Sequence, residues 1–342
     1  MPRRTRRRSV SMADIAQVAG VSVSTVSHVV NQTRPVAPAT ADAVLSAMAE
    51  LGYVPDRVTR SMRTEGQLMI GLAMSSISNV YFGDVVHGLE RAAEAAGYSV
   101  LLAETHDDPH GELRAVTHLL ARSVDAIVLA HCGDPDRALR YCAQRDVPVI
   151  LVDRLDNREL DQIGPENVES TALLAEHLAG LGHTRVGMVA GRPGLSTTLD
   201  RVAGFRAGLA RSGIEVDEDL VVSGDSTTDG AHAATMALLQ GRRPPTALVV
   251  SNNLMTIGVM RAARDLGMSV PGDLALVAFD DFAWADLFHP RLTVMAQPAV
   301  EMGAEAFGLA LNRLKARESP ARRVVLHPTF MHRDSCGCGQ PA

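Results

Sequence analysis

Polar and charged side chains follow several apolar stretches of the sequence, and their types suit the binding of a small hydroxylated ligand. They are Ser75 and Ser76, Asp153 and Arg154, Asn252 and Asn253, Asp280 and Asp281, and Arg201 in "RVAGFRAGL". Carboxylates, amides and guanidinium groups form paired and bidentate hydrogen bonds with ligand hydroxyls. The set predicts a site for a sugar, a nucleoside or another polyol. A single Asp or Asn after a strand is more often a turn residue, so the site requires that these side chains converge.

The signatures of several enzyme classes are missing from the sequence. It contains no G-x-S-x-G, H-E-x-x-H or G-x-G-x-x-G pattern. A Walker A loop is excluded because the only lysine, Lys315, lies outside the required glycine-rich context. We therefore expect no enzyme activity, no catalytic residues and no cofactor.

The elements that would position the polar residues alternate between strand and helix. Apolar runs "LMIGLAM", "YSVLLAE", "DAIVLAH" and "VPVILVD" are separated by helical stretches near 83–96, 110–122 and 135–145. A second series follows, with "RVGMVAG", "LVVSGD", "TALVVSN" and "LALVAFDD". This alternation predicts two lobes, each with a parallel sheet covered by helices on both faces. Ligands of such folds bind beyond the carboxyl ends of the strands, where the polar residues lie.

The charge of the chain is unevenly distributed. Residues 1–63 contain nine arginines and four acids, a net charge of +5, so the remainder carries -11 of the total of -6. A basic head on an acidic body indicates that only the head meets a polyanion. Residues 1–10, with the arginines between Arg3 and Arg8, alone would be consistent with a disordered solubilising tail.

Two short helices are predicted directly after this basic tail. Ser11 and Asp14 form an S-x-x-D capping box, Gly20 can end the first helix, and Ser22 can cap a second helix near 23–30. A third helix begins near Pro38. Two helices joined by a short turn with Gly form a helix-turn-helix, whose second helix enters the major groove through its N-terminal residues. A three-helix bundle without DNA binding is the alternative that spacing alone leaves open.

The stretch "MADIAQVAGVSVSTVSHVVNQTRPVAPATADAVLSAMAELGYVPDRVTRSM" resembles the headpiece of the LacI/GalR family of bacterial transcription regulators. The resemblance implies a helix-turn-helix domain over residues 11–55. It assigns DNA contacts to Val23, Ser24, Thr25, His28 and Asn31. Ala37 and Ala41 depart from the family pattern, which usually has Ser and Arg there, and remove an N-cap and one phosphate contact.

The next segment, residues 56–67, is short, polar and basic, and is predicted to be a linker. By the resemblance it forms a hinge helix when two subunits sit on DNA, with Arg57 and Met62 among the contacts. Met62 takes the place of the usual Leu that wedges into the minor groove. A plain flexible tether is the alternative.

The stretches "LVDR", "RVAGF", "VVSNNLMTIGVMRA", "VPGDLALVAFDD" and "RLTVMAQP" resemble the periplasmic-binding-protein-like core of the same family. The implied core spans 68–335, with lobe one at 68–166 plus 298–326 and lobe two at 167–297 plus 327–335, before a tail at 336–342. The resemblance implies effector-binding roles for eight residues: Ser75, Tyr81, Phe82, Asp153, Arg201, Asn252, Asp280 and Gln297. Asn253 and Ser226 differ from the residues usual in the family at these positions, so the resemblance does not determine the identity of the effector.

Together these features predict an all-α headpiece on a two-lobed α/β core, and a dimeric repressor of a pseudo-palindromic operator. We expect a small polar effector, preferably a sugar, with a purine- or nucleoside-responsive corepressed regulator as the alternative. An effector-independent DNA-binding protein and a solute-binding transport component fit less well. No run reaches the roughly 18 apolar residues of a membrane span, so we expect a cytoplasmic protein. We expect no metal site, since "SCGCG", with Cys336 and Cys338, is a lone C-x-C.

Overall fold

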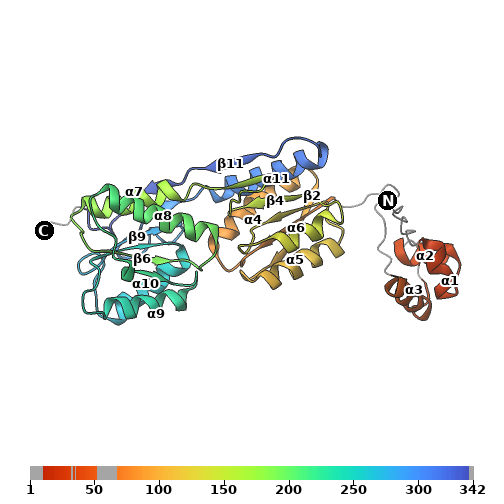
Figure 1. Cartoon of the computed structure of the whole chain (residues 1–342), viewed down its shortest axis with the longest axis horizontal. Helices are drawn as coiled ribbons and strands as arrows, with labels where there is room; N and C mark the ends of the chain where they lie inside the picture. Colours follow the sequence, from red (N-terminus) through yellow and green to blue (C-terminus); the bar gives the residue numbers. More distant parts are fainter. Residues whose placement is uncertain (1–10, 32–33, 35, 52–67, 339–342) are drawn as a thin grey trace, which may run out of the picture. The chain divides into compact units, whose positions relative to one another are not determined.

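The computed structural model describes residues 11–31, 34, 36–51 and 68–338. The chain divides into two compact units, Met1–Gly66 and Gln67–Ala342 (Figure 1). The predicted basic tail at 1–10 and the predicted hinge at 56–67, with Arg57 and Met62, lie outside the described residues. Among the described helices, none is long and apolar enough to cross a membrane.

The first unit consists of three helices, α1 (Met12–Ala19), α2 (Val23–Asn31) and α3 (Pro38–Leu51). The capping box is present at the start of α1, and Gly20 ends that helix with a left-handed φ of 66°. Ile15, Val26 and Val44 are fully buried in the small core between the helices. Val18, which recurs at the same helical spacing in the sequence, is 46% exposed and lies outside this core.

The first sheet of the second unit has the strand order β11-β5-β4-β3-β1-β2, and its strands are parallel. They are β1 (Leu68–Met74), β2 (Tyr98–Glu104), β3 (Ala126–Leu129), β4 (Val149–Val152), β5 (Gln162–Pro165) and β11 (Arg323–Leu326). Helices α4 (Val80–Ala95) and α11 (Ala299–Lys315) pack on one face. Helices α5 (Pro109–Ala121) and α6 (Asp136–Ala143) pack on the other. This sheet and its helices are called the first lobe below.

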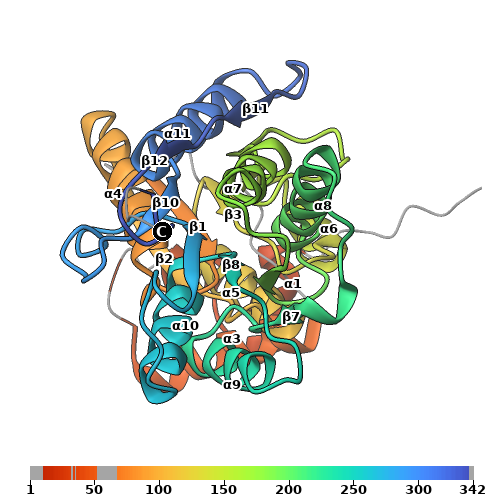
Figure 2. The same cartoon turned by 90° about the vertical axis from the view of Figure 1, so that its left-hand side faces the viewer.

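The second sheet repeats this arrangement with the order β12-β10-β9-β8-β6-β7. Its strands are β6 (Val186–Ala190), β7 (Val221–Ser223), β8 (Ala247–Val250), β9 (Ala275–Phe279), β10 (Thr293–Ala296) and β12 (Thr329–Met331). Helices α7 (Val168–Gly180) and α8 (Ser196–Arg211) cover one face, and α9 (Thr228–Leu239) and α10 (Asn253–Asp265) the other (Figures 1 and 2). Only β12, among the strands described in this sheet, pairs antiparallel. This sheet and its helices are the second lobe.

The chain passes between the sheets after β5, after β10 and after β11. The two lobes are therefore joined by three backbone passages, which is an arrangement that can act as a hinge. The last described residues also belong to the second lobe, because Cys336 is 1% exposed within its core. The predicted tail at 336–342 was therefore placed too early, and the packed structure continues through Cys338.

Helices α4 and α11 cross at glycines that allow their backbones to touch. A Cβ atom added to Gly88 would lie 1.9 Å from the carbonyl oxygen of Val300, and one added to Gly303 would lie 2.0 Å from that of Val85. Backbone atoms cannot move aside as a flexible side chain can. The distance between these two helices is therefore set by the absence of side chains at the crossing.

We predict that Gly88→Ala destabilises the core by about 1–3 kcal/mol or more, because the added methyl overpacks a backbone contact. The matched control is Gly83→Ala in the same helix, where an added Cβ meets nothing within 4 Å. That control should be neutral or stabilising by up to about 1 kcal/mol, as expected for replacing a helical glycine. Urea unfolding of the two variants measures the difference, and equal stabilities would contradict the close crossing.

Candidate functional site

A cavity of about 280 Å³ lies between the two lobes at the carboxyl ends of both sheets. Its size is near the lower limit of typical small-ligand pockets. Residues that follow strands of either sheet line it. The lining also includes residues of α4 and α8, and it contains all eight residues predicted to bind an effector: Ser75, Tyr81, Phe82, Asp153, Arg201, Asn252, Asp280 and Gln297. The fold thus brings the set together, while the ligand-binding role of each residue stays a prediction.

Two aspartates occupy corresponding positions in the two lobes. Asp153 follows β4 and Asp280 follows β9, and both adopt the left-handed backbone conformation, with φ of 69° and 75°. Non-glycine residues rarely adopt this conformation, and Asp tolerates it better than most. Both side chains are almost fully buried at the cavity, at 5% and 3% exposure. Each lobe therefore presents one carboxylate to the space between them.

Hydrogen bonds fix both carboxylates. The hydroxyl of Tyr81 donates to Oδ1 of Asp153 at 2.6 Å. Nε2 of Gln297 donates to Oδ1 of Asp280, and the backbone N–H of Asn253 donates to its Oδ2 at 3.3 Å. Burial raises the pKa of Tyr81 well above its ordinary value, and the charge of Asp153 raises it further, so the phenol remains a donor. Burial also raises the pKa of Asp280, although Arg201 favours its ionised form.

Arg201 is also buried at the cavity, and its guanidinium is held by contacts on several sides. Its Nε donates to Oδ1 of Asn167 at 2.8 Å, its Nη1 donates to the carbonyl of Ser251, and its guanidinium carbon lies 3.7 Å from the ring centroid of Phe279. Arg201 lies in the second turn of α8, which begins at Ser196. The guanidinium is thus a fixed positive charge at the cavity wall.

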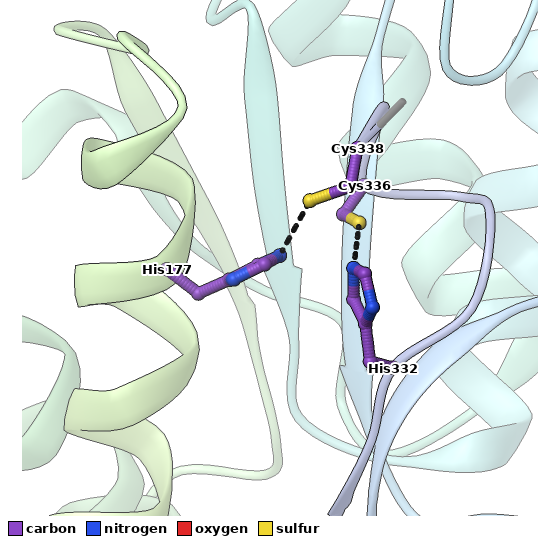
Figure 3. A group of neighbouring side chains, drawn as sticks. All are labelled: His177, His332, Cys336 and Cys338. Atoms are coloured by element: carbon purple, nitrogen blue, oxygen red, sulfur yellow. Dashed lines mark hydrogen bonds between the residues drawn. The ribbon is translucent and has the colours of Figure 1, made fainter. Parts of the chain in front are cut away.

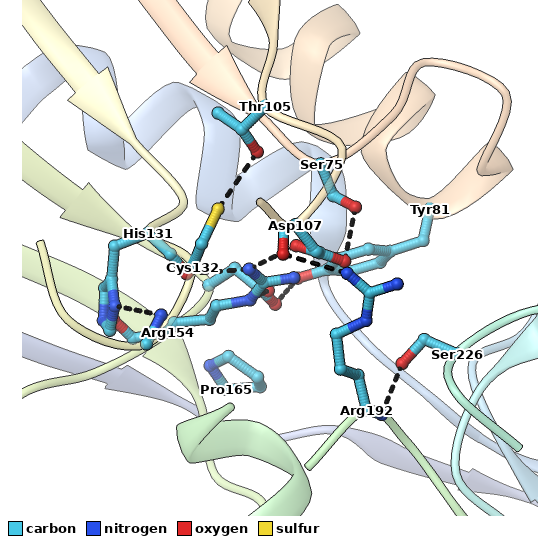
Figure 4. A network of polar contacts seen from close by, with 12 residues as sticks. Ser75, Tyr81, Thr105, Asp107, His131, Cys132, Arg154, Pro165, Arg192 and Ser226 are labelled. Carbon is cyan, nitrogen blue, oxygen red and sulfur yellow. Dashed lines mark hydrogen bonds and ion pairs between the residues drawn. The ribbon is translucent and has the colours of Figure 1, made fainter. Parts of the chain in front are cut away.

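A second buried arginine, Arg154, forms an ion pair in the first lobe (Figure 4). Its Nη1 lies 2.6 Å from Oδ1 of Asp107 and 2.7 Å from the carbonyl of His131. Ser75 donates to the other carboxylate oxygen of Asp107 at 2.7 Å. Burial disfavours the charge on Asp107, but Arg154 and Ser75 outweigh it and lower its pKa. Ser75 therefore lines the cavity with its hydroxyl already committed to this pair.

Arg192 was missed by the sequence analysis although it reaches across the cavity (Figure 4). It follows β6, and its Nη1 donates to the backbone carbonyl of Asp107 in the first lobe at 2.9 Å. Its Nε is held by Asp225 at 2.9 Å. Asn253 makes a second bond between the lobes, from Nδ2 to Oδ1 of Asn79 at 2.9 Å. Arg192 directly follows the apolar run "RVGMVAG", so a search for polar residues after each predicted strand would have found it.

The predicted DNA-reading side chains lie at the start of α2 in the first unit. Val23 is 49% exposed and Ser24 is also exposed, whereas Thr25 and His28 are half-buried. The hydroxyl of Ser22 caps the helix by accepting from the backbone N–H of Thr25 at 3.1 Å. The side chain of Asn31 lies outside the described residues. The side chains of Val23 and Ser24 are therefore exposed at the start of α2 and do not contribute to the core of this unit.

A helix-turn-helix unit followed by a two-lobed α/β core with a polar cavity defines a ligand-responsive DNA-binding regulator. Comparisons with known proteins agree. The family "Bacterial regulatory proteins, lacI family" matches residues 11–56, and the "Periplasmic binding protein-like domain" matches residues 175–336. The chain belongs to the LacI family of bacterial transcription regulators, which bind DNA and are not enzymes.

Its similar relatives include two proteins named HTH-type transcriptional repressor PurR. The one from Pectobacterium carotovorum is 32% identical over 333 residues, covering 96% of this chain and 97% of the relative. The one from Vibrio cholerae is 30% identical over 328 residues, covering 95% and 97%.

Two solved structures also resemble the whole chain. A complex of the transcriptional regulator CelR with cellobiose matches with a TM-score of 0.73 and 28% identity, covering 95% of this chain and 99% of the other. The Lac repressor dimer bound to operator and the anti-inducer ONPF matches with a TM-score of 0.72 and 29% identity, covering 96% and 99%.

We predict that Asp107→Asn lowers the free energy of unfolding at pH 7 by about 3 kcal/mol, because it leaves Arg154 buried with a weakened partner. The folded-state pKa of Asp107 is lowered, so its stabilisation is present above its unfolded pKa of about 3.9 and is lost as pH falls through the folded pKa. The gap between wild type and variant should narrow from pH 7 to about pH 3.5.

The control for this prediction is Asp225→Asn, which breaks the more exposed ion pair with Arg192. The side chain of Asp225 is 54% exposed, so its loss should cost at most about 1 kcal/mol. Urea titrations of both variants at the two pH values provide the comparison. A pH-independent deficit in Asp107→Asn would rule out the ion pair as the source of its stability.

Proposed function

We propose that this chain is a cytoplasmic homodimeric repressor whose operator affinity is controlled by a small sugar or related polyol bound between the lobes. The observation that carries the proposal is the convergence of two buried carboxylates and a buried guanidinium on one cavity. Such a set recognises neighbouring hydroxyl groups through paired hydrogen bonds. The cellobiose complex of the similar CelR structure supports the same ligand class.

Two buried polar atoms at the cavity add support for a polar ligand. Oε1 of Gln297 and Oγ of Ser251 are buried and have no hydrogen-bond partner within the described part of the chain. A buried polar atom without a partner costs about 1–3 kcal/mol. A ligand hydroxyl or amide that reaches these atoms would recover this free energy.

A purine or nucleoside effector is the second candidate, and a specific observation favours it. The relatives named PurR are about 30% identical over nearly the whole chain. The cavity also offers the rings of Tyr81 and Phe82, which pack edge-to-face with centroids 5.2 Å apart. A planar base would stack on an aromatic face, whereas a sugar would depend mainly on Asp153, Asp280 and Arg201.

Effector control would act through the hydrogen bonds between the lobes. Arg192 reaches Asp107, and Asn253 reaches Asn79, so a ligand between the lobes changes the free energy of the closed arrangement. A ligand shifts a conformational equilibrium only by its difference in affinity for the two states. Two core units in a dimer would transmit that shift to two headpieces and thereby to operator affinity.

DNA recognition is assigned to Val23, Ser24, Thr25 and His28. We predict that His28→Ala weakens binding to the protein's preferred duplex by about tenfold, since one good base contact is worth about 1–3 kcal/mol. The preferred duplex is selected from random sequences with wild-type protein. Affinity for random duplex should change little at the same salt concentration, because that binding depends on phosphate contacts.

The matched control for DNA binding is His87→Ala, which removes an exposed histidine from α4 in the core. It should bind the selected duplex as wild type does. If His28→Ala and wild type discriminate equally between selected and random duplexes, His28 does not read bases. Wild-type protein that binds both duplexes equally would contradict the proposed function itself.

We predict that Arg201→Ala abolishes the thermal shift caused by the effector, because Arg201 supplies the fixed positive charge of the cavity. Monosaccharides, disaccharides, purine bases and nucleosides are screened by the melting temperature of wild-type protein. The control is Arg206→Ala, in the same helix but paired with Glu218 at the surface. A shift that survives in Arg201→Ala and disappears in Arg206→Ala would place the ligand elsewhere.

A further inference from the structure

Four potential metal ligands lie together in the second lobe, on the side of the sheet that α7 covers (Figure 3). His177 projects from α7, and His332, Cys336 and Cys338 come from the segment after β12. The sequence predicted no metal site here, because it showed only the C-x-C pair. The fold adds His177 by packing α7 against this segment, and His332 lies four residues before Cys336 in the segment itself.

The distances between the ligand atoms match those of a tetrahedral zinc site. With bonds of about 2.3 Å to sulfur and about 2.0–2.1 Å to nitrogen, a sulfur and a nitrogen on the same tetrahedral ion lie about 3.6 Å apart. The Sγ of Cys336 is 3.5 Å from Nε2 of His332, and the Sγ of Cys338 is 3.6 Å from Nε2 of His177. All four ligand atoms lie within 4.8 Å of one another.

The segment that carries the cysteines is held by its own hydrogen bonds. Ser335 is fully buried; its hydroxyl donates to the carbonyl of Leu276 at 2.7 Å and accepts from the N–H of Thr293 at 2.8 Å. Asp334 forms two bonds with Arg291, at 2.8 and 3.0 Å. The cysteines are therefore held in position by contacts that do not depend on a metal.

Gly337 allows the two thiols to converge. It lies between the cysteines with a φ of 85°, a conformation that side chains rarely adopt. The turn brings the sulfur atoms of Cys336 and Cys338, two positions apart in the chain, toward the histidines, as Figure 3 shows. A C-x-C pair with glycine in the middle thus places two thiols on one tight turn.

The surroundings of the cluster are apolar on the protein side. Cys336 is 1% exposed and belongs to the core under α7, while Cys338 is half-buried. The ring of Phe330 packs edge-to-face on His177 with centroids 5.1 Å apart. His332 is exposed, which leaves an entry path for an ion from solvent.

We propose that His177, His332, Cys336 and Cys338 bind a structural zinc ion. Two thiolates and two imidazoles form a closed tetrahedral set that selects zinc and leaves no open coordination position for catalysis. Binding releases the thiol protons and requires no change of oxidation state. This site is separate from the cavity between the lobes, so it stands whatever the effector is.

The ion would fasten the C-terminal segment to α7. That helix starts directly after Asn167, whose side chain accepts a hydrogen bond from Arg201 at the cavity. Metal binding to the folded state stabilises it by mass action. The zinc site therefore fixes the helix that begins at the passage between the lobes.

The test measures metal in tag-free full-length protein purified under a reductant and without chelator. We expect inductively coupled plasma mass spectrometry to find about one zinc ion per chain. After removal of zinc, a Co²⁺ titration of the wild type should saturate at about one equivalent. It should also give thiolate-to-cobalt charge-transfer bands and the strong visible absorption of tetrahedral cobalt.

The variants Cys338→Ser and His177→Ala should each lose the stoichiometric zinc and the rise in melting temperature on zinc addition. The matched controls Cys132→Ser and His118→Ala remove a cysteine and a histidine elsewhere and should retain both. The thiol of Cys132 has its pKa raised to about 12 by burial, so it is protonated and a poor ligand. Circular dichroism establishes that each variant is folded.

Three results would overturn the proposal. The first is wild-type protein that stays well below one equivalent after reconstitution, and the second is zinc content that the cluster variants keep. The third is a Cys336–Cys338 disulfide in protein purified under reductant. Stoichiometric binding of another metal in place of zinc would overturn the assignment of the ion. The cobalt spectrum is recorded on the wild type, so it tests for tetrahedral thiolate coordination even if a variant fails to fold.

Discussion

The compensation of buried charge at the ends of the two sheets is the constraint on which the site depends. A buried guanidinium is costly unless hydrogen bonds and opposite charges surround it. Arg201 meets this requirement with Asn167, Ser251 and the ring of Phe279, and Arg154 meets it with Asp107 and His131. These partners come from different strands and helices, so the loops after the strands must hold fixed positions. The cavity is the space that these fixed loops enclose.

The two lobes share a strand order, and residues at equivalent strand ends adopt the same backbone conformation at the cavity. Asp153 and Asp280 follow equivalent strands with the same left-handed backbone. His106 and Asp107 after β2 correspond to Asp225 and Ser226 after β7, and all four have positive φ. The lobes differ in which arginine is buried: Arg154 lies in the loop after β4, whereas Arg201 lies in the helix after β6. The buried arginine of the first lobe is thus ion-paired, whereas the buried arginine of the second lobe is hydrogen-bonded to neutral groups.

Features set by neighbours in the chain could be predicted from the sequence, and features set by packing could not. The capping box at Ser11 and the left-handed Gly20 depend on a few adjacent residues. The strands could be predicted because each is a short apolar run, and their ends located Ser75, Asp153, Asn252 and Asp280. The family resemblance added Tyr81, Phe82 and Gln297. The contact between Arg192 and Asp107 joins residues 85 positions apart, and His177 meets Cys338 across 161 positions. No local pattern in the sequence predicts contacts between residues so far apart. The position of Arg192 directly after a predicted strand could have marked it as a candidate cavity residue. The family resemblance supplied the roles that spacing alone could not.

The bonds between the lobes have a size that suits control by a ligand. A typical intramolecular hydrogen bond contributes about 0.5–1.5 kcal/mol, so those of Arg192 and Asn253 together contribute about 2 kcal/mol. Allosteric coupling between two sites is typically about 1–3 kcal/mol. Under the proposed function, an effector that joined Asp153 of one lobe to Asp280 and Arg201 of the other would change the closure free energy by a comparable amount. A more apolar contact between the lobes would hold them closed regardless of the ligand. Polar contacts between the lobes would therefore keep the opening equilibrium within the range that a small molecule can shift.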